Sequence, residues 1–255
     1  DAEAKLLKGR REEGKIERVQ EEKERVPYVP GVRLDIERAE LVTQSYQGTE
    51  GEPMVLRRAK AMAHLLDNMT LYILPNERIV GNITSEPNCI HTYPELFSRW
   101  LDRAINKEYA MLLDDDKRQK LHEIHKYWRD KSFHGMERNF LPEEIKPYWS
   151  YRNHGAFFWQ HGGHVGTPNY NKIFKVGLKG IIEQCKNRLK EISSDPQIYL
   201  NGKEYLKQRN FLEAAIITLE AVCRLGKRFS NLAKVEAKEE KDERRKAKLE
   251  ELSEI

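Results

Sequence analysis

Hydrophobic residues recur at helical spacing along much of the chain, beginning with residues 54–66. This stretch repeats apolar residues at intervals of three or four positions, namely Leu56, Ala59, Ala63 and Leu66. The spacing predicts an amphipathic helix with one buried face. We expect Thr49 to cap its start, Pro53 to lie in its first turn and Asn68 to end it. The apolar run Leu71–Ile73 then predicts a short buried strand.

Further helices are predicted downstream. One follows Pro94 and carries Leu96, Phe97, Trp100 and Leu101, and another starts at the acidic run 114–116 and carries Leu121, Ile124, His125 and Trp128. Residues 172–192 and 205–235 form two longer amphipathic segments, separated by the turn signals Asp195–Pro196 and Asn201–Gly202. The second has a broad apolar face, made of Phe211, Leu212, Ala215, Ile216, Leu219, Val222, Leu225 and Phe229. We interpret both as packing helices in a mostly helical fold.

Both ends of the chain are almost entirely charged. Residues 1–26 contain only sparse apolar positions, which predicts a lead-in helix at the surface rather than a binding arm. The Pro and Gly residues of Val26–Gly31 break this helix. Residues 234–255 are predicted to form one long solvated helix. We therefore expect a lead-in segment, 1–30, followed by a helical region, 31–255.

The composition and charge of the chain argue against several classes of protein. The 255 residues are 39% hydrophobic and 34% charged, and 45 basic against 41 acidic residues give a net charge of +4. A nucleic-acid-binding protein would carry a concentrated basic face, which this chain lacks. No apolar run is long enough for a membrane span, and the charged start does not resemble a signal peptide, so we expect a cytoplasmic protein. Cys89, Cys185 and Cys223 are far apart and are expected to be reduced thiols.

An ordered set of short motifs lies between residues 37 and 81. Glu37–Ser45 reads acidic–Arg-Ala-x-Leu-x-Thr-x-Ser, and Thr49–Pro53 reads Thr-Glu-Gly-x-Pro. The pair Arg57-Arg58 follows, and Glu77–Gly81 ends in Ile-Val-Gly. In this order the motifs resemble the amino-terminal part of the glycyl radical enzymes, the family of pyruvate formate-lyase and the coenzyme-B12-independent glycerol dehydratase. The resemblance is strongest to the dehydratase branch and extends through most of the chain.

The most unusual segment is 148–166, which holds six aromatic residues, three histidines and four glycines in 19 positions. Glycines allow close backbone approach, and aromatic residues with polar tips suit a concave site for a small polar molecule. A buried aromatic loop accounts for the same composition. A zinc site from His154, His161 and His164 is possible by residue type, but no acidic or cysteine partner accompanies them. His122 and His125 lie three apart on a predicted helix, and without a third ligand we interpret them as surface or packing residues.

The family resemblance gives this segment a specific interpretation. Glycerol dehydratases carry an aromatic run, then Gly-x-Gly-His-Val, then a Gly-rich Ile-Ile helix, and this chain has Gly162–Val165 followed by residues 172–182. The resemblance implies that His164 lies against the substrate hydroxyls and protonates the departing one, a role that imidazole chemistry suits. It implies a substrate pocket lined by Phe157, Phe158, Trp159, Gln160 and His161. This run is bulkier than the tyrosine-rich version, so an altered diol, an amino alcohol or a larger organic acid remains open.

The resemblance also implies the architecture and chemistry of a whole enzyme. Its fold would be a ten-stranded α/β barrel wrapped by helices, with this chain as a mostly helical amino-terminal portion. Its reaction would be that of a lyase or dehydratase that abstracts hydrogen through a thiyl radical. The family needs a Cys followed two positions later by Glu, and a C-terminal Gly loop. None of the three cysteines has Glu at that offset and no glycine follows Gly226, so both loops are expected outside this chain.

Cofactors and partners follow from the same resemblance. This chain is expected to bind no cofactor itself, and the glycyl radical would reside on a downstream segment. A separate iron–sulfur activating enzyme that uses S-adenosylmethionine would install it, in an anaerobic cytoplasm. The expected partners are this enzyme, a small-molecule substrate, the remainder of the enzyme chain and a second copy in a homodimer. Fumarate addition, arylacetate decarboxylation, pyruvate formate-lyase-like acyl transfer and a non-catalytic helical scaffold remain alternatives.

Overall fold

The computed structural model describes residues 33–75, 77, 79–96, 105, 113–146, 149–150, 157–158 and 169–254, without the side chains of residues 134, 149–150 and 157–158. The chain divides into two units, Asp1–Arg33 and Leu34–Ile255. All described residues except Arg33 belong to the second unit. The predicted lead-in helix 1–26, its break at 26–31, and Phe97, Trp100 and Leu101 of the helix predicted after Pro94 lie outside the described residues.

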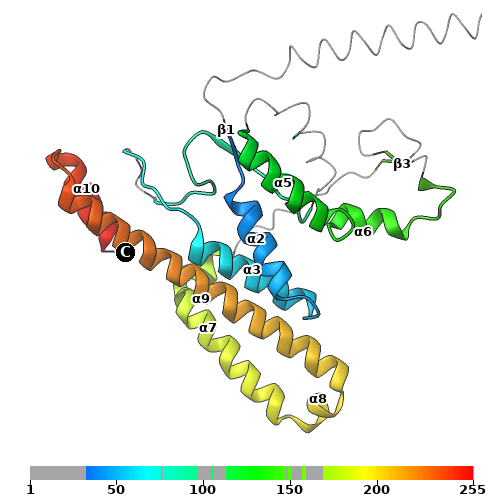
Figure 1. The fold of residues 1–255 in the computed structure, drawn as a ribbon. Helices are drawn as coiled ribbons and strands as arrows, with labels where there is room; N and C mark the ends of the chain where they lie inside the picture. Colours follow the sequence, from blue (N-terminus) through cyan, green and yellow to red (C-terminus); the bar gives the residue numbers. More distant parts are fainter. Residues whose placement is uncertain are drawn as a thin grey trace, which may run out of the picture. The chain divides into compact units, whose positions relative to one another are not determined.

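Helices contain most of the described residues, which confirms the predicted mostly helical fold (Figure 1). The elements are, in chain order, β1 (Arg33–Asp35), α2 (Glu37–Gly48), α3 (Met54–Asn68), β2 (Cys89–His91), α5 (Asp115–Trp128), α6 (Phe133–Phe140), β3 (Trp149–Ser150), β4 (Phe157–Phe158), α7 (Tyr170–Ser194), α8 (Pro196–Leu200), α9 (Gly202–Glu239) and α10 (Glu243–Ser253). β1 pairs with β2, and β3 pairs in parallel with β4. None of the described helices has the length and apolar composition that crossing a membrane requires.

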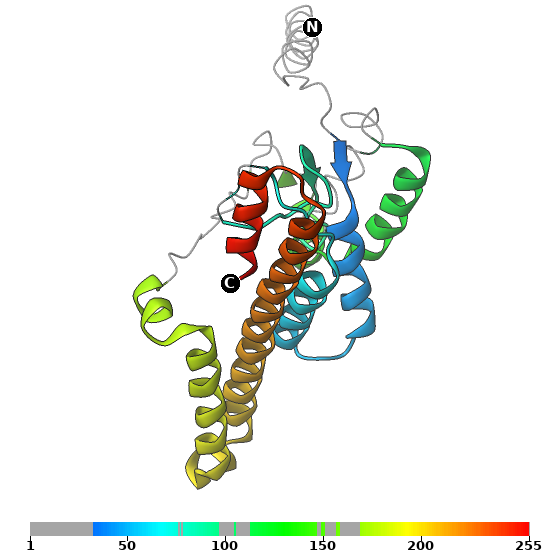
Figure 2. The ribbon, with the colours of Figure 1, turned by 90° about the vertical axis from the view of Figure 1, so that its left-hand side faces the viewer.

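The long helix α9 organises the second unit. Helices α3 and α7 flank α9 on two sides, as both ribbon views show (Figures 1 and 2). The buried positions of α3, and of α9 as far as residue 221, are alanines, namely Ala59, Ala61, Ala63, Ala214 and Ala221. Small side chains let helix backbones approach closely, so this part of the unit is held by close helix packing.

A first hydrophobic cluster joins β1, α2 and α5. Its fully buried members include Leu34, Leu121 and Ile105, and Trp128 is 2% exposed. The start of α5 was predicted from its acidic run, and Asp114 indeed caps it by accepting a hydrogen bond from the Lys117 backbone N–H at 2.8 Å. Leu121, Ile124, His125 and Trp128 are its buried residues, which confirms the predicted buried face.

A second hydrophobic cluster corrects the prediction of one long solvated helix over 234–255. Helix α9 ends at Glu239, Asp242 caps α10, and α10 packs back against α9. Leu249 and Leu252, 2% and 7% exposed, join Phe229, Ala233 and Ile73 in this cluster. The charged composition of residues 234–255 gave no sign that α10 packs back against α9. Two leucines on one face of this short helix are enough to pack it there.

Three predictions around α3 are wrong. Thr49 does not cap α3 but is the C-cap of α2, and its hydroxyl donates to the Ser45 carbonyl at 2.8 Å. Pro53 occupies the N-cap of α3 instead of the first turn. Residues 71–73 form no strand. They run as a segment without regular secondary structure whose Ile73 packs on α9, so their apolar character reflects side-chain burial rather than sheet pairing. The predicted helix end at Asn68 is confirmed.

The two long helices differ in detail from their predicted form. Gly177 interrupts α7 with φ 66° and ψ 171°, a backbone conformation that L side chains rarely adopt, so the segment predicted as continuous is kinked. Of the predicted apolar face of α9, Phe229 is buried, but Phe211 and Val222 are 63% and 38% exposed. The predicted turn at 195–202 contains the short helix α8.

Candidate functional site

The predicted substrate segment is described only in part. The backbone of Phe157 and Phe158 forms β4, which pairs with β3 in the register Trp149 to Phe157 and Ser150 to Phe158. Trp159, Gln160, His161 and His164 lie outside the described residues, as does His154 of the alternative zinc site. The predicted pocket segment therefore begins with a short strand, β4, that pairs with β3. The roles assigned to its side chains stay predictions.

Helix α7 follows the predicted substrate segment directly. Asn169 caps this helix by accepting a hydrogen bond from the Lys172 N–H at 3.0 Å. The kink at Gly177 separates the first two turns from the part that packs on α9. Tyr170 and Phe174 in these turns stack at 6.1 Å with 22° between their rings, and they are 56% and 82% exposed.

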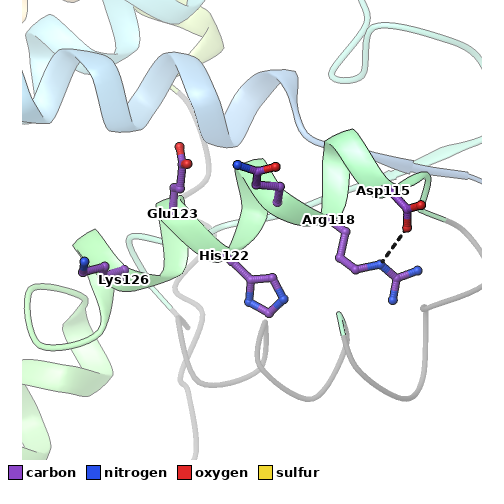
Figure 3. Close-up of a pocket in the computed structure, with 6 residues that line it drawn as sticks. Asp115, Arg118, His122, Glu123 and Lys126 are labelled. Atoms are coloured by element: carbon purple, nitrogen blue, oxygen red, sulfur yellow. Dashed lines mark ion pairs between the residues drawn. The ribbon is translucent and has the colours of Figure 1, made fainter.

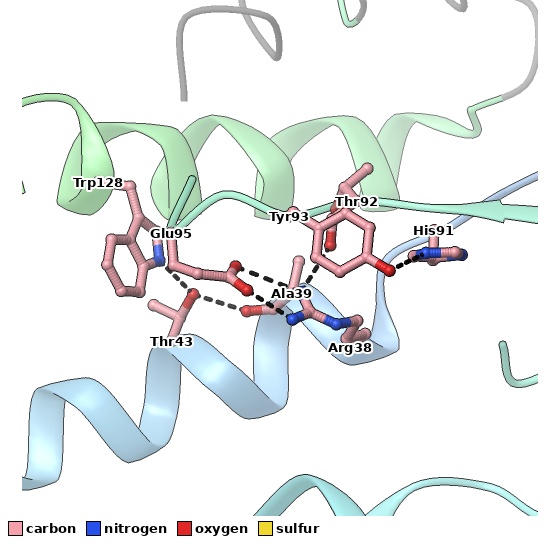
Figure 4. Close-up of polar contacts among 8 residues, drawn as sticks. All are labelled: Arg38, Ala39, Thr43, His91, Thr92, Tyr93, Glu95 and Trp128. Atoms are coloured by element: carbon pink, nitrogen blue, oxygen red, sulfur yellow. Dashed lines mark hydrogen bonds and ion pairs between the residues drawn. The ribbon is translucent and has the colours of Figure 1, made fainter. Parts of the chain in front are cut away.

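A densely bonded polar cluster surrounds Arg38 of α2 (Figure 4). Its guanidinium donates through Nη2 to Glu95 Oε1 at 2.5 Å, and through Nη1 to Glu95 Oε2 at 3.2 Å and to the Thr92 carbonyl at 3.0 Å. The same group lies 4.0 Å from the centre of the Tyr93 ring, in cation–π geometry. Both side chains of the ion pair are less than one-fifth exposed. Arg38 therefore fixes the segment after β2 onto α2.

A histidine and a tyrosine stand at the outer edge of this cluster. His91 Nε2 lies 2.5 Å from the Tyr93 hydroxyl, and the two rings meet edge to face at 4.7 Å. Burial and the nearby Arg38 charge lower the pKa of His91, against the smaller opposing effects of Asp35 and Glu95. A lowered pKa favours the neutral imidazole, which can accept a hydrogen bond from the tyrosine hydroxyl.

The cluster continues into the core through Thr43. The Trp128 Nε1–H of α5 donates to the Thr43 hydroxyl at 2.8 Å, and that hydroxyl donates to the Ala39 carbonyl at 2.6 Å. Trp128 also meets the Tyr46 ring edge to face at 4.8 Å. These contacts connect α2 to α5, and the Arg38 contacts connect α2 to the segment after β2, so the cluster holds the three elements together. The buried Thr92 hydroxyl is the atom of the cluster that has no hydrogen-bond partner among the described residues.

An open groove of about 350 Å³ lies along α5 (Figure 3). It is lined by alternating charges and one histidine, namely Asp115, Arg118, Gln119, His122, Glu123 and Lys126. His122 is exposed in the groove while His125 is 7% exposed in the core. Among the described residues no group of three or more His, Cys, Asp or Glu side chains is arranged to hold a metal ion. The described residues that line the groove all come from α5, so they offer no set of functional groups that converge from different elements.

Sequence reasoning missed the Arg38 cluster as a structural unit. Arg38 occurs in a motif that carries the family resemblance, but 57 positions separate it from Glu95 and no local pattern predicts their contact. The spacing of His91 and Tyr93, two apart, places them on the same side of an extended segment. That spacing is the one signal that could have suggested their interaction.

Comparison with known proteins identifies the wider family. The model of the family described as "Pyruvate formate lyase-like" matches residues 10–255. Isethionate sulfite-lyase of Desulfovibrio desulfuricans is 32% identical over 240 residues, which cover 85% of this chain and 27% of that protein.

Solved structures agree with the family match. The glycerol-bound B12-independent glycerol dehydratase from Clostridium butyricum superposes with a TM-score of 0.72 at 31% identity, over 88% of this chain and 28% of that one. A glycyl radical enzyme from Archaeoglobus fulgidus gives a TM-score of 0.67 at 28% identity, over 88% and 29%. The chain thus spans little more than a quarter of the length of these relatives. It belongs to the pyruvate formate lyase-like family, the family of the glycyl radical enzymes.

Proposed function

We propose that this chain is the amino-terminal portion of a glycyl radical lyase that eliminates a group from a small hydroxylated organic substrate. The observation that carries the proposal is the family match over residues 10–255 together with relatives named as a sulfite-lyase and a glycerol dehydratase. Both names describe eliminations from a short carbon chain. The whole-enzyme activity belongs to the proposal, because the chain covers 27–28% of these relatives.

In this proposal the chain supplies part of the substrate site. His164 donates a proton to the departing group, and the bulky run Phe157–His161 shapes the pocket around the carbon skeleton. Imidazole suits this task because it carries a transferable proton near neutral pH. Because this run differs from the tyrosine-rich version of the glycerol dehydratases, the proposal leaves the substrate open among an altered diol, an amino alcohol and a larger organic acid.

The residues of this chain do not fit the radical-bearing roles. Cys89, Cys185 and Cys223 are followed two positions later by His, Asn and Leu, respectively, rather than by Glu. A glycyl radical on another segment would supply the hydrogen abstraction when the enzyme is activated. An iron–sulfur enzyme that uses S-adenosylmethionine would install that radical. The proposal places the enzyme in an anaerobic cytoplasm, as a homodimer.

The experiment compares two histidine variants in the complete enzyme, meaning this chain together with the polypeptide that carries the Cys and Gly loops. After anaerobic activation, turnover is measured on glycerol, isethionate and larger diols. H164Q is expected to lower kcat at least about a hundredfold, the range of a lost general acid, with an unchanged radical signal in electron paramagnetic resonance. H122Q, at the exposed histidine of the α5 groove, is the matched control and should retain wild-type turnover. Equal turnover of H164Q and the wild type would remove His164 from the mechanism.

A further inference from the structure

The turn between α8 and α9 contains a pair of residues that can react with each other. Asn201 is the only asparagine of the chain that is followed by glycine. In such a pair the backbone nitrogen of the glycine can reach the side-chain amide of the asparagine, because glycine has no Cβ to hinder the approach. Every other asparagine precedes a residue with a side chain, which restricts the same backbone movement.

The structure leaves this pair open to water and uncrowded. Asn201 and Gly202 are both exposed. A Cβ built on Gly202 would meet no atom of the described residues within 4 Å, so no described part of the chain blocks the movement of this backbone. Gly202 is the first residue of α9, where a backbone N–H has no partner within the helix. The nitrogen that has to react is therefore not held by the hydrogen bonds of the helix.

The capping hydrogen bond of α9 favours reaction at the same amide. Asn201 Oδ1 accepts from the Glu204 N–H at 3.3 Å, which folds the asparagine side chain forward over the start of the helix. A donor on this oxygen draws electron density from the amide carbon Cγ and stabilises the oxyanion that forms when a nucleophile adds to it. The electrophilic carbon and the nucleophilic nitrogen thus belong to adjacent residues of one exposed turn.

We propose that Asn201 is a site of spontaneous deamidation, a modification that does not depend on the proposed function. The Gly202 nitrogen attacks Cγ of Asn201, and the new N–Cγ bond closes a five-membered succinimide. The Cγ–Nδ2 bond breaks, and ammonia leaves with the proton of the Gly202 N–H. Water then opens the ring. Its addition at Cγ gives aspartate, and its addition at the backbone carbonyl gives isoaspartate, whose main chain is one methylene longer.

The two products differ in their effect on the start of α9. Aspartate keeps the cap acceptor and adds a negative charge at the N-terminal end of the helix, where the helix dipole favours it. Isoaspartate lengthens the backbone between Tyr199 and Tyr205, whose rings meet edge to face at 5.3 Å and join α8 to α9. Either product lowers the net charge of +4 by one unit. Ion-exchange chromatography therefore separates modified from unmodified protein.

The test compares Asn201 with a matched asparagine. Asn169 is also exposed and also caps a helix, since its Oδ1 accepts from the Lys172 N–H at 3.0 Å, but Tyr170 follows it. The folded full chain is incubated in mildly alkaline buffer, and tandem mass spectrometry measures the converted fraction of each asparagine over time. Asn201 should convert at least about tenfold faster than Asn169, because tyrosine lacks the conformational freedom of glycine. G202A, whose added atom meets no clash, should slow conversion at Asn201 to the rate of Asn169.

Three results would overturn the inference. Equal rates at Asn201 and Asn169 would show that the following glycine gives no advantage. An unchanged rate in G202A would exclude the attack that the proposal assigns to the backbone nitrogen of residue 202. Conversion of Asn201 in the urea-unfolded chain but not in the folded protein would show that the fold protects the pair.

Discussion

Arg38 and Glu95 form a bidentate ion pair that joins α2 to the segment after β2, with N–O distances of 2.5 and 3.2 Å. Because both side chains are largely shielded from water, neither charge is well solvated without the other. The pair thus fixes the distance between two parts of the chain that are 57 residues apart.

Removing one partner of this pair should destabilise the second unit. R38A leaves the Glu95 carboxylate shielded without its cation, and we expect the free energy of unfolding to fall by about 2–3 kcal/mol. R38K should recover only part of this loss, because lysine cannot make the two parallel contacts. Urea unfolding followed by circular dichroism measures both. As a control, K60A removes the more exposed pair with Glu52 and should cost under about 1 kcal/mol; equal losses for R38A and K60A would contradict this account.

The Trp128–Thr43 hydrogen bond predicts a second effect. T43V keeps the shape of the side chain but leaves the indole N–H of Trp128, a residue 2% exposed, without its acceptor. We expect a loss of about 1–2 kcal/mol in the free energy of unfolding. T43S retains the hydroxyl and should lose less than T43V. Denaturant titration of both variants measures the free energy of unfolding. A T43V protein as stable as the wild type would show that the Trp128–Thr43 hydrogen bond contributes nothing to stability.

Local signals in the sequence predicted some elements and failed for others. Asp114 caps α5 from within three residues, so this helix start could be predicted from composition alone. The return of α10 onto α9 depends on burial of Leu249 and Leu252 against distant residues, which a charge pattern does not reveal. The prediction of a strand at Ile73 was wrong because a segment without regular secondary structure can bury an apolar side chain just as a strand does. The Arg38–Glu95 contact depends on the fold of the whole unit and had no local signal.

The lowered pKa of His91 predicts a pH effect on stability. Between the folded pKa and the unfolded value near 6.5, the unfolded chain binds more protons, so stability falls as the pH drops through this window. H91Q removes this contribution. We expect the melting temperature of H91Q to change less between pH 7.5 and pH 5.5 than that of the wild type. If differential scanning calorimetry gives both proteins the same pH dependence, His91 does not carry a depressed pKa.

Two glycines in helices should respond oppositely to alanine. A Cβ at Gly135 of α6 would collide with the Arg129 carbonyl oxygen and lie 2.8 Å from the Asp130 Cα, both backbone atoms. G135A should therefore lower the free energy of unfolding by about 2–3 kcal/mol. At Gly226 in α9 nothing lies within 4 Å of the added atom, so G226A should raise it by about 0.5–1 kcal/mol. Chemical denaturation of the two variants measures both changes, and a neutral G135A would contradict the packing at α6.

The central claim, that this chain is part of a glycyl radical lyase, is tested most directly by reading the coding frame past Ile255. The account predicts that this frame, or a neighbouring one, encodes a loop with Cys followed two positions later by Glu, and then a C-terminal glycine loop. A stop codon after Ile255 with no neighbouring frame that supplies both loops would contradict the catalytic proposal. The helical unit would then be a binding or scaffold protein derived from such an enzyme.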